Sequence, residues 1–410
     1  MSPVLPLDII ALVIDIVGEN KDTNLLKELA LVSHSVLQIC NKHLFATVEL
    51  HDAVPNYHVA SSKKGFVKLL KSRPDVVRYI RKLTYKVTPT YPSFDNDDQL
   101  LSPILPNFLR TISRLNCLTI NALKLDWNTL DSSLQSALLH LMHLPTINHI
   151  DLSCIGNFPI SSLTSCVNLH RLDISNLDIC EVDGSSSPEI VVQSEMIPKI
   201  LEFYTSESPL LTTKLLLAKR QDGRPAFNFT DLGLLSVYTT SFEDERNIRY
   251  ILQNAKLLEE LHLTIRHDLS LLWLHDILSI SSSTLKVLDL SISLYDLREA
   301  GLCEGLETMV GYNMLEVLSI EFKVNGCDTE EKVGSIIQDV EKVLVGPGWS
   351  ALRQVSFKVS IFLIRILRPS ESLFEDEKWR LYEKLQSLPD RYLSHLPKLE
   401  SVVFKYSVDY

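Results

Sequence analysis

The chain has 410 residues, of which 45% are hydrophobic and 13 are glycine, so it can bury a large core and lacks the composition of a disordered protein. Its net charge of −11 argues against nucleic-acid binding through a basic field, which needs a surplus of Lys and Arg. Seven cysteines without a C-x-x-C pair indicate thiols in a reducing compartment. No apolar run reaches the ~18 residues of a membrane span, and no basic region precedes the apolar start. We therefore expect a cytoplasmic or nuclear protein without a membrane partner.

The first 50 residues predict three short amphipathic helices and then a strand. The first helix is expected from Leu7 to Val17, with Pro6 in its first turn and Gly18 as a left-handed cap. Its apolar residues recur at helical spacing: Ile9, Ile10, Val13, Ile14 and Val17. Candidate N-caps for the next two helices are Asp22, Thr23 and Asn24, then Ser33 and Ser35. Three helices of about ten residues are too small to bury this much apolar surface, so part of it should face something else.

The segment from about residue 4 to residue 46 resembles the F-box, in the divergent form common in fungal proteins. The resemblance rests on Leu5-Pro6-Leu7-Asp8-Ile9-Ile10, Ile14-Asp15-Ile16-Val17, Leu26, Leu29-Ala30-Leu31-Val32-Ser33 and Leu44-Phe45. Ser33, Val36 and Phe45 stand where the family's pattern has Cys, Trp and Trp.

The resemblance implies that residues 1–46 form a unit that docks on the small Skp-type adaptor of a cullin-RING ubiquitin ligase. The implied contact residues are Leu5, Pro6, Ile9, Ile10, Ile14, Leu26, Leu29 and Val32. The alternative is that these helices only cap the domain that follows.

The rest of the chain repeats one template, apolar-x-x-apolar-x-apolar, which predicts a buried turn leading into a short strand. The template begins at Phe45, Ile80, Leu115, Ile147, Leu169, Leu232, Leu258, Leu285, Leu315, Leu352 and Leu399. Leu215 and Leu217 are interpreted as a further strand with a degenerate start. Segments with helical spacing lie between the strands, for example Leu134 to Leu144, Leu271 to Ile280 and Val333 to Val345.

Strands that alternate with helices form parallel sheets, because consecutive parallel strands require a crossover. The pattern resembles irregular leucine-rich repeats, so residues 47–410 are expected to form an α/β solenoid, a curved parallel sheet inside with helices outside. The Asn or Cys that usually follows each strand is absent, so the turns must be held in another way. A doubly wound α/β domain is the alternative, although no Gly-rich phosphate loop follows any strand. A flexible insertion is expected near residues 178–209, and a C-terminal capping helix near residues 371–388.

The sequence contains no G-x-S-x-G, H-E-x-x-H or P-loop motif. His140, His143 and His149 are interpreted as ordinary histidines, and the acidic run from Glu243 to Glu245 as solvated surface. We therefore expect no enzyme activity, no cofactor and no metal site.

The leading hypothesis is a substrate-recognition subunit of an SCF-type ubiquitin ligase, whose solenoid binds a protein target. Candidate target-binding residues on the concave face are Asp151, Asp173, His262, Asp289 and Ser319. The alternative hypotheses are a non-catalytic leucine-rich-repeat scaffold and, with the least support, an α/β enzyme.

Overall fold

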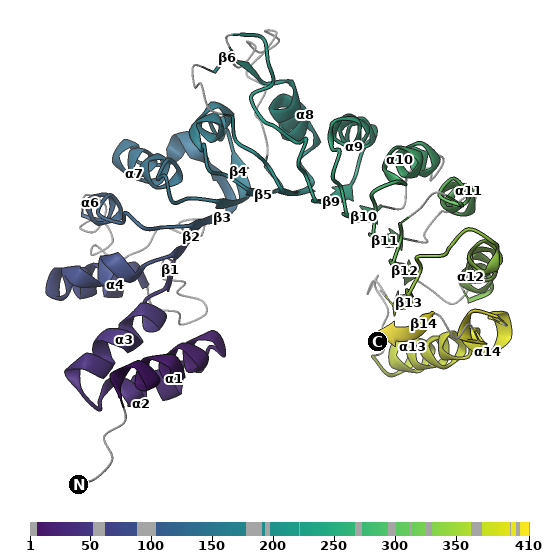
Figure 1. Cartoon of the computed structure of the whole chain (residues 1–410), viewed down its shortest axis with the longest axis horizontal. Helices are drawn as coiled ribbons and strands as arrows, with labels where there is room; N and C mark the ends of the chain where they lie inside the picture. Colours follow the sequence, from purple (N-terminus) through teal and green to yellow (C-terminus); the bar gives the residue numbers. More distant parts are fainter. Residues whose placement is uncertain are drawn as a thin grey trace. The chain divides into compact units, whose positions relative to one another are not determined.

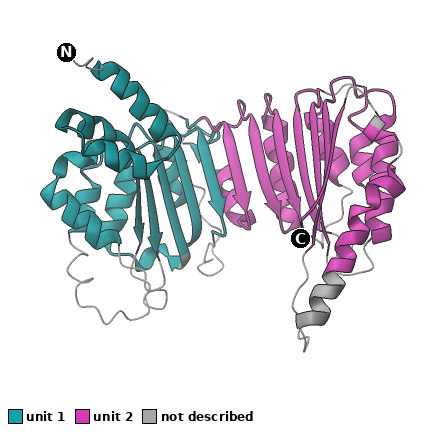
Figure 2. Cartoon of the chain, turned by 90° about the horizontal axis from the view of Figure 1, so that it is seen from below, with its two compact units in different colours: residues 1–198, 218–227 teal, residues 199–217, 228–410 magenta. Residues whose placement is uncertain are grey.

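The structure is a computed structural model. It describes residues 6–51, 62–87, 104–177, 191–192, 197–220, 222–266, 273–293, 301–311, 314–324, 330–361, 371–393, 395–398 and 402–409. The chain divides into two compact units, coloured separately in Figure 2: unit 1 comprises Met1–Pro198 with Ala218–Phe227, and unit 2 comprises Lys199–Leu217 with Asn228–Tyr410.

Unit 1 begins with the N-terminal helical unit, which consists of α1 (Leu7–Glu19), α2 (Thr23–Ala30) and α3 (His34–Leu44). The Asp22 carboxylate accepts a hydrogen bond from the Leu25 N–H at 3.0 Å and so caps α2. The Ser33 hydroxyl caps α3 by accepting from the Val36 N–H at 3.2 Å. The prediction that Gly18 ends the first helix was wrong, because α1 continues to Glu19 and the left-handed residue is Lys21, with φ of 56°.

The remainder of unit 1 is a parallel sheet with helices between its strands. The strands, in their order in the sheet, are β1 (Thr47–His51), β2 (Lys82–Val87), β3 (Cys117–Asp126), β4 (His149–Gly156) and β5 (Arg171–Ser175). The helical segments are α4 (Ser62–Ser72), η2 (Pro74–Tyr79), α6 (Leu105–Leu109), η3 (Trp127–Thr129), α7 (Ser132–Met142) and η4 (Ile160–Ser165). A separate short pair joins β6 (Val191–Val192) to β8 (Lys219–Arg220).

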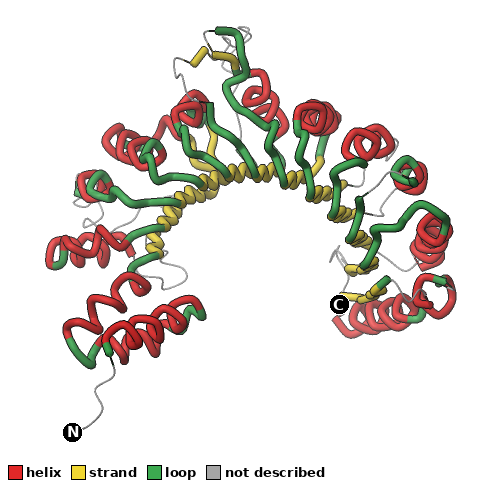
Figure 3. The backbone as a smooth tube through the Cα atoms, viewed as in Figure 1, coloured by secondary structure: helices red, strands yellow, loops and turns green. Residues whose placement is uncertain are grey.

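Unit 2 continues the same alternation of strand and helix. Its parallel strands are β7 (Glu202–Ser206), β9 (Leu234–Thr239), β10 (Glu260–Ile265), β11 (Val287–Ser293), β12 (Val317–Val324), β13 (Gln354–Ile361) and β14 (Val403–Asp409). Its helices are α8 (Pro209–Leu217), α9 (Phe242–Asn254), α10 (Leu274–Ser281), α11 (Leu302–Glu307), α12 (Glu330–Val345), α13 (Glu371–Gln386), α14 (Leu388–Tyr392) and η7 (Leu396–Lys398). The helices that alternate with the strands, from α4 to α12, lie on one side of the strands within each unit (Figures 1 and 3).

The apolar template explains this arrangement. Leu83, Leu118, Ile150 and Leu172 pair in register on successive strands, and each of their side chains is 0% exposed. Alternate residues point to the other face, because side chains in a strand alternate. The fold is therefore the predicted mixed α/β fold of irregular leucine-rich repeats, with parallel strands and helices on one face.

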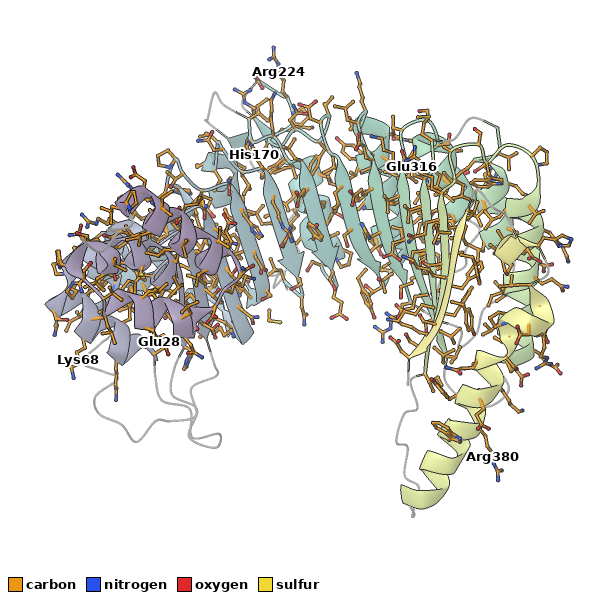
Figure 4. All side chains as sticks on the ribbon, turned by 60° about the horizontal axis from the view of Figure 1, so that its bottom comes forward. Glu28, Lys68, His170, Arg224, Glu316 and Arg380 are labelled. Carbon is orange, nitrogen blue, oxygen red and sulfur yellow. The ribbon has the colours of Figure 1, made fainter. Side chains whose placement is uncertain are left out.

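Backbone hydrogen bonds at the start of each strand replace the Asn or Cys side chains that hold the turns in regular leucine-rich repeats. The Asn116 carbonyl accepts from the N–H groups of Asn148 and His149 at 3.0 and 3.1 Å. In unit 2 the Glu316 carbonyl accepts in the same way from Arg353 and Gln354 at 2.8 and 3.0 Å. Glu316 is labelled in Figure 4 at the edge where the unit 2 strands begin. One carbonyl thus satisfies two donors of the next repeat, which is how the turns are held without a recurrent Asn side chain.

Three predictions about the elements need correction. Leu215 and Leu217 lie in helix α8, which begins at Pro209, and are not part of a strand. Strand β7 falls inside the predicted insertion at residues 178–209, of which 178–190 and 193–196 lie outside the described residues. Asp244 is not solvated surface: it is 2% exposed and forms a capping box with Ser241 at the start of α9.

The predicted C-terminal helix is present as α13, and the strand predicted from the template at Leu399 follows it as β14. The β14 strand pairs with β13 in parallel, and the Tyr406 hydroxyl donates to the Leu385 carbonyl at 2.6 Å. This bond ties the last strand to the helix that precedes it.

Candidate functional site

The N-terminal helical unit has a small apolar core of its own. Ile14, Leu26, Val36 and Cys40 are at most 5% exposed and form its centre. Partly buried side chains surround them: Ile10, Val17, Leu29, Ala30, Ile39 and Leu44. These residues hold the three helices together and leave other apolar side chains outside.

Helix α1 carries a second apolar face that stays exposed. Ile9, Leu12, Val13 and Ile16 are 46%, 58%, 46% and 51% exposed. Their spacing of i, i+3, i+4 and i+7 places them on one face of the helix. We call these four residues the α1 stripe.

A second exposed apolar site lies at the turn between α2 and α3. Leu31 is 87% exposed and Val32 is 71% exposed, and both precede the cap residue Ser33. We call Leu31 and Val32 the turn pair. Large aliphatic side chains so open to water mark a surface suited to another apolar partner.

The structure sorts the eight predicted adaptor-contacting residues into four groups. Pro6, Ile9 and Val32 are exposed, whereas Ile10 and Leu29 are half-buried. Ile14 and Leu26 are 0% and 2% exposed, so a partner on the outer surface would not touch them, and we correct that assignment. Leu5 lies outside the described residues.

The predicted set of adaptor contacts also left out four exposed apolar residues of this surface: Leu12, Val13, Ile16 and Leu31. The signal that could have found three of them is the second helical stripe beginning at Ile9, which runs beside the Ile10, Ile14 and Val17 stripe.

Polar contacts fix α1 on α3. The Asp15 carboxylate lies 2.6 Å from Lys42 Nζ and 2.7 Å from His43 Nε2. Hydrogen bonds from Lys42 and then His43 hold the pKa of the Asp15 carboxyl below its usual value. Gly18 explains the close approach of α3, because a Cβ atom there would lie 2.2 Å from His43 Nδ1. These contacts set the orientation of the helix that bears the α1 stripe.

The predicted target-binding residues are half-buried on the sheet face that carries no helices. In unit 1, Asp151 and Asp173 are register partners on β4 and β5. In unit 2, His262, Asp289 and Ser319 form one row across β10, β11 and β12. A hydrogen bond to Asp289 raises the pKa of His262, whose Nδ1 lies 3.4 Å from the Asp289 carboxylate. The row therefore presents an imidazole, a carboxylate and a hydroxyl to any ligand on this face.

The three histidines interpreted as ordinary differ in their surroundings. His143 bonds the Ser162 carbonyl at 2.9 Å, an unremarkable surface contact. His149 instead lies at the start of strand β4 between the Cys117 thiol and the Asp173 carboxylate, two neighbours that its interpretation as an ordinary histidine did not include. Across the described ranges, no group of three or more His, Cys, Asp or Glu side chains is placed to hold a metal ion.

Fold and repeat pattern define an irregular leucine-rich-repeat array preceded by a three-helix unit. No protein-family model matches the chain. No curated protein matches it either. Among solved structures, it is similar to a chain of the crystal structure of the Rad7 and Elc1 complex in yeast, with 13% identity and a TM-score of 0.28 over 90% of this chain and 97% of the other. Within the described residues, no helix combines the length and apolar character needed to cross a membrane.

Proposed function

We propose that the protein is a substrate-recognition subunit of an SCF-type cullin-RING ubiquitin ligase. In this proposal the N-terminal helical unit docks on a Skp-type adaptor through the α1 stripe and the turn pair. The observation that carries the proposal is the α1 stripe: four large aliphatic side chains at helical spacing stay about half exposed. The F-box resemblance of residues 4–46 supplies the kind of partner.

The free energy gained by burying apolar side chains exceeds the cost of association only if the α1 stripe and the turn pair both take part. Full burial of an aliphatic side chain is worth ~1.5–3 kcal/mol, so four half-exposed residues yield roughly 3–6 kcal/mol. Association costs about 4–15 kcal/mol, which the α1 stripe alone does not reliably exceed. Leu31 and Val32, which are 87% and 71% exposed, add roughly 2–5 kcal/mol. We therefore place the turn pair in the same interface as the stripe.

The repeats then hold the protein to be ubiquitinated, and the chain itself contributes no catalytic groups. Its task is proximity, because tethering a target raises the concentration of its lysines near the charged ubiquitin carrier. The mixed row of His262, Asp289 and Ser319 is a proposed part of the target surface. This function places the protein in the cytoplasm or nucleus.

Two charge substitutions on the stripe test the docking step. Leu12→Asp and Ile16→Asp place a carboxylate on the outer face of α1, so each should weaken binding to a purified Skp-type adaptor at least about tenfold in calorimetry. The matched control is Leu257→Asp, which changes a leucine that is 56% exposed in unit 2. It should leave adaptor affinity unchanged. Adaptor binding that survives both stripe substitutions would refute the proposal.

The same experiment separates a docking module from a simple cap. A cap uses its buried residues to stabilise the repeats, and nothing then depends on the outer face of α1. Under that alternative, Ile14→Ala lowers stability while Leu12→Asp and Ile16→Asp change neither stability nor binding. Under our proposal the stripe variants keep the melting temperature of the unaltered chain and lose the adaptor.

A further inference from the structure

Three reactive side chains meet on the sheet face of unit 1 that carries no helices. Cys117 opens strand β3, His149 opens β4, and Asp173 is the third residue of β5. Cys117 and His149 are register partners on neighbouring strands. All three alternate with residues of the buried row, so their side chains share the open face of the sheet.

The three groups are linked in the order thiol, imidazole, carboxylate. Cys117 Sγ lies 3.3 Å from His149 Nδ1, and His149 Nε2 lies 3.1 Å from Asp173 Oδ2. The Arg171 guanidinium holds the same carboxylate, with Nε and Nη2 at 3.0–3.2 Å. Each ring nitrogen thus has one partner, and the carboxylate that orients the ring is itself fixed. This is the arrangement by which proteins activate a thiol as a nucleophile.

The surrounding charges favour an imidazolium beside the sulfur. Burial alone would lower the pKa of His149, but hydrogen bonds to Asp173 and Cys117 outweigh it and raise the pKa to about 9. Lys82 is the register partner of Cys117 on β2, so a second cation stands on its other side. Asp151 also faces the site, and burial, reinforced by the Asp173 charge, raises its pKa. A cation beside a sulfur stabilises the negative charge that develops on the sulfur when it acts as a nucleophile.

The other cysteines show what an unactivated thiol looks like in this chain. Cys40 and Cys166 are 0% and 3% exposed, and burial raises the pKa of the Cys166 thiol to about 12. Cys154 on β4 is half-buried like Cys117, but no hydrogen-bonding neighbour is present among the described residues. Cys117 therefore combines access with activation.

We propose that Cys117 is a covalent modification site for soft electrophiles of the α,β-unsaturated carbonyl class. The Cys117 sulfur forms a bond to the β-carbon of the electrophile, and the electron pair of the carbon–carbon double bond moves toward the carbonyl as an enolate. The proton on His149 Nδ1 passes to the α-carbon, leaving a neutral imidazole whose Nε2–H still donates to Asp173. No oxidant is needed, and the product is a stable thioether.

The test uses N-ethylmaleimide, a small probe of this class, at low excess over the full chain. Peptide mass mapping gives the rate of modification of each cysteine. Because His149, held by Asp173, contacts only Cys117, that thiol should react about tenfold faster than Cys154 at pH 7. The ratio should fall toward one above pH 9, because the pKa of His149 is about 9 and its imidazole is neutral there.

Two variants separate activation from simple exposure. His149→Gln should reduce the Cys117 rate about tenfold at pH 7, and Asp173→Asn should reduce it by a smaller factor. The Cys154 rate should stay unchanged in both, which would show that the sheet is still folded. Equal rates for Cys117 and Cys154 in the unaltered chain, or a Cys117 rate unaffected by His149→Gln, would overturn the proposal.

Discussion

Replacing Gly18 by alanine should destabilise the N-terminal helical unit, although glycine is ordinarily the weaker residue inside a helix. At a solvent-exposed position inside a helix, replacing glycine by alanine stabilises the helix by about 1 kcal/mol. At Gly18 the new Cβ would lie 2.2, 2.4 and 2.6 Å from His43 Nδ1, Cγ and Cε1. The Cγ atom is close to the backbone, so rotation of the ring cannot relieve the overlap. His43 must move and give up its 2.7 Å contact with Asp15.

Overpacking of this kind costs about 1–3 kcal/mol, which exceeds the gain in helix propensity. We expect a net loss of about 1 kcal/mol, measured as faster hydrogen exchange of the α1 amides and as a lower denaturant midpoint. Gly65→Ala is the matched control, because Gly65 lies in helix α4 with no atom within 4 Å of its added Cβ. That substitution should stabilise the chain by about 1 kcal/mol.

A double-mutant cycle tests the cause. Once His43→Ala has removed the ring, Gly18→Ala should become stabilising by about 1 kcal/mol. If Gly18→Ala stabilises the unaltered chain, or destabilises it equally with and without the His43 ring, the steric argument is wrong.

Three further predictions follow from two buried polar groups and the half-buried His149. Asp244→Ala should lower the free energy of unfolding by about 2 kcal/mol in denaturant titrations, because the Asp244 carboxylate accepts from the Thr240 and Ser241 N–H groups; a change below about 0.5 kcal/mol would contradict this. Glu341→Ala should cost about 2–3 kcal/mol and speed hydrogen exchange at His395 and Leu396, whose N–H groups donate to Glu341 at 2.8 and 2.9 Å; unchanged exchange would argue against it. His149 has its pKa raised to about 9, so its contribution to stability is complete below about pH 6.5 and is lost as pH rises toward 9. Unfolding free energies across that range should fall, and His149→Gln should remove the decline.

The repeats could be predicted because each strand buries the same apolar positions. Strand β7, which the template did not predict, shows where this signal ends. Its lead-in is Ile200-x-x-Phe203, but the third inward position holds Thr205, which is 6% exposed. The Thr205 hydroxyl is satisfied by the Thr212 hydroxyl of α8 at 3.0 Å, so a polar residue could occupy an apolar position. That partner belongs to the following helix, and the strand pattern alone does not reveal it.

The reactive cluster of unit 1 could not be predicted for a different reason. Cys117, His149 and Asp173 are separated by 32 and 24 residues, and nothing near any of them resembles a catalytic motif. They meet because the strand register pairs Cys117 with His149. It also pairs Asp173 with Asp151, which lies two residues after His149 on the same strand. Such sites depend on the spacing between repeats, which is irregular in this chain.

Helix α1 is the element in which sequence and structure together are most informative. Its two apolar stripes, Ile10-Ile14-Val17 and Ile9-Leu12-Val13-Ile16, cover roughly 200° of the helix at 100° per residue. A surface helix with one buried face needs only about half of that. The first stripe already packs against α2 and α3, as the burial of Ile14 shows. The second exposes aliphatic surface that contributes nothing to the fold and promotes aggregation unless something covers it. A helix that served only to cap the repeats would be as stable with polar residues at these four positions, so the stripe is better explained by a partner than by the fold.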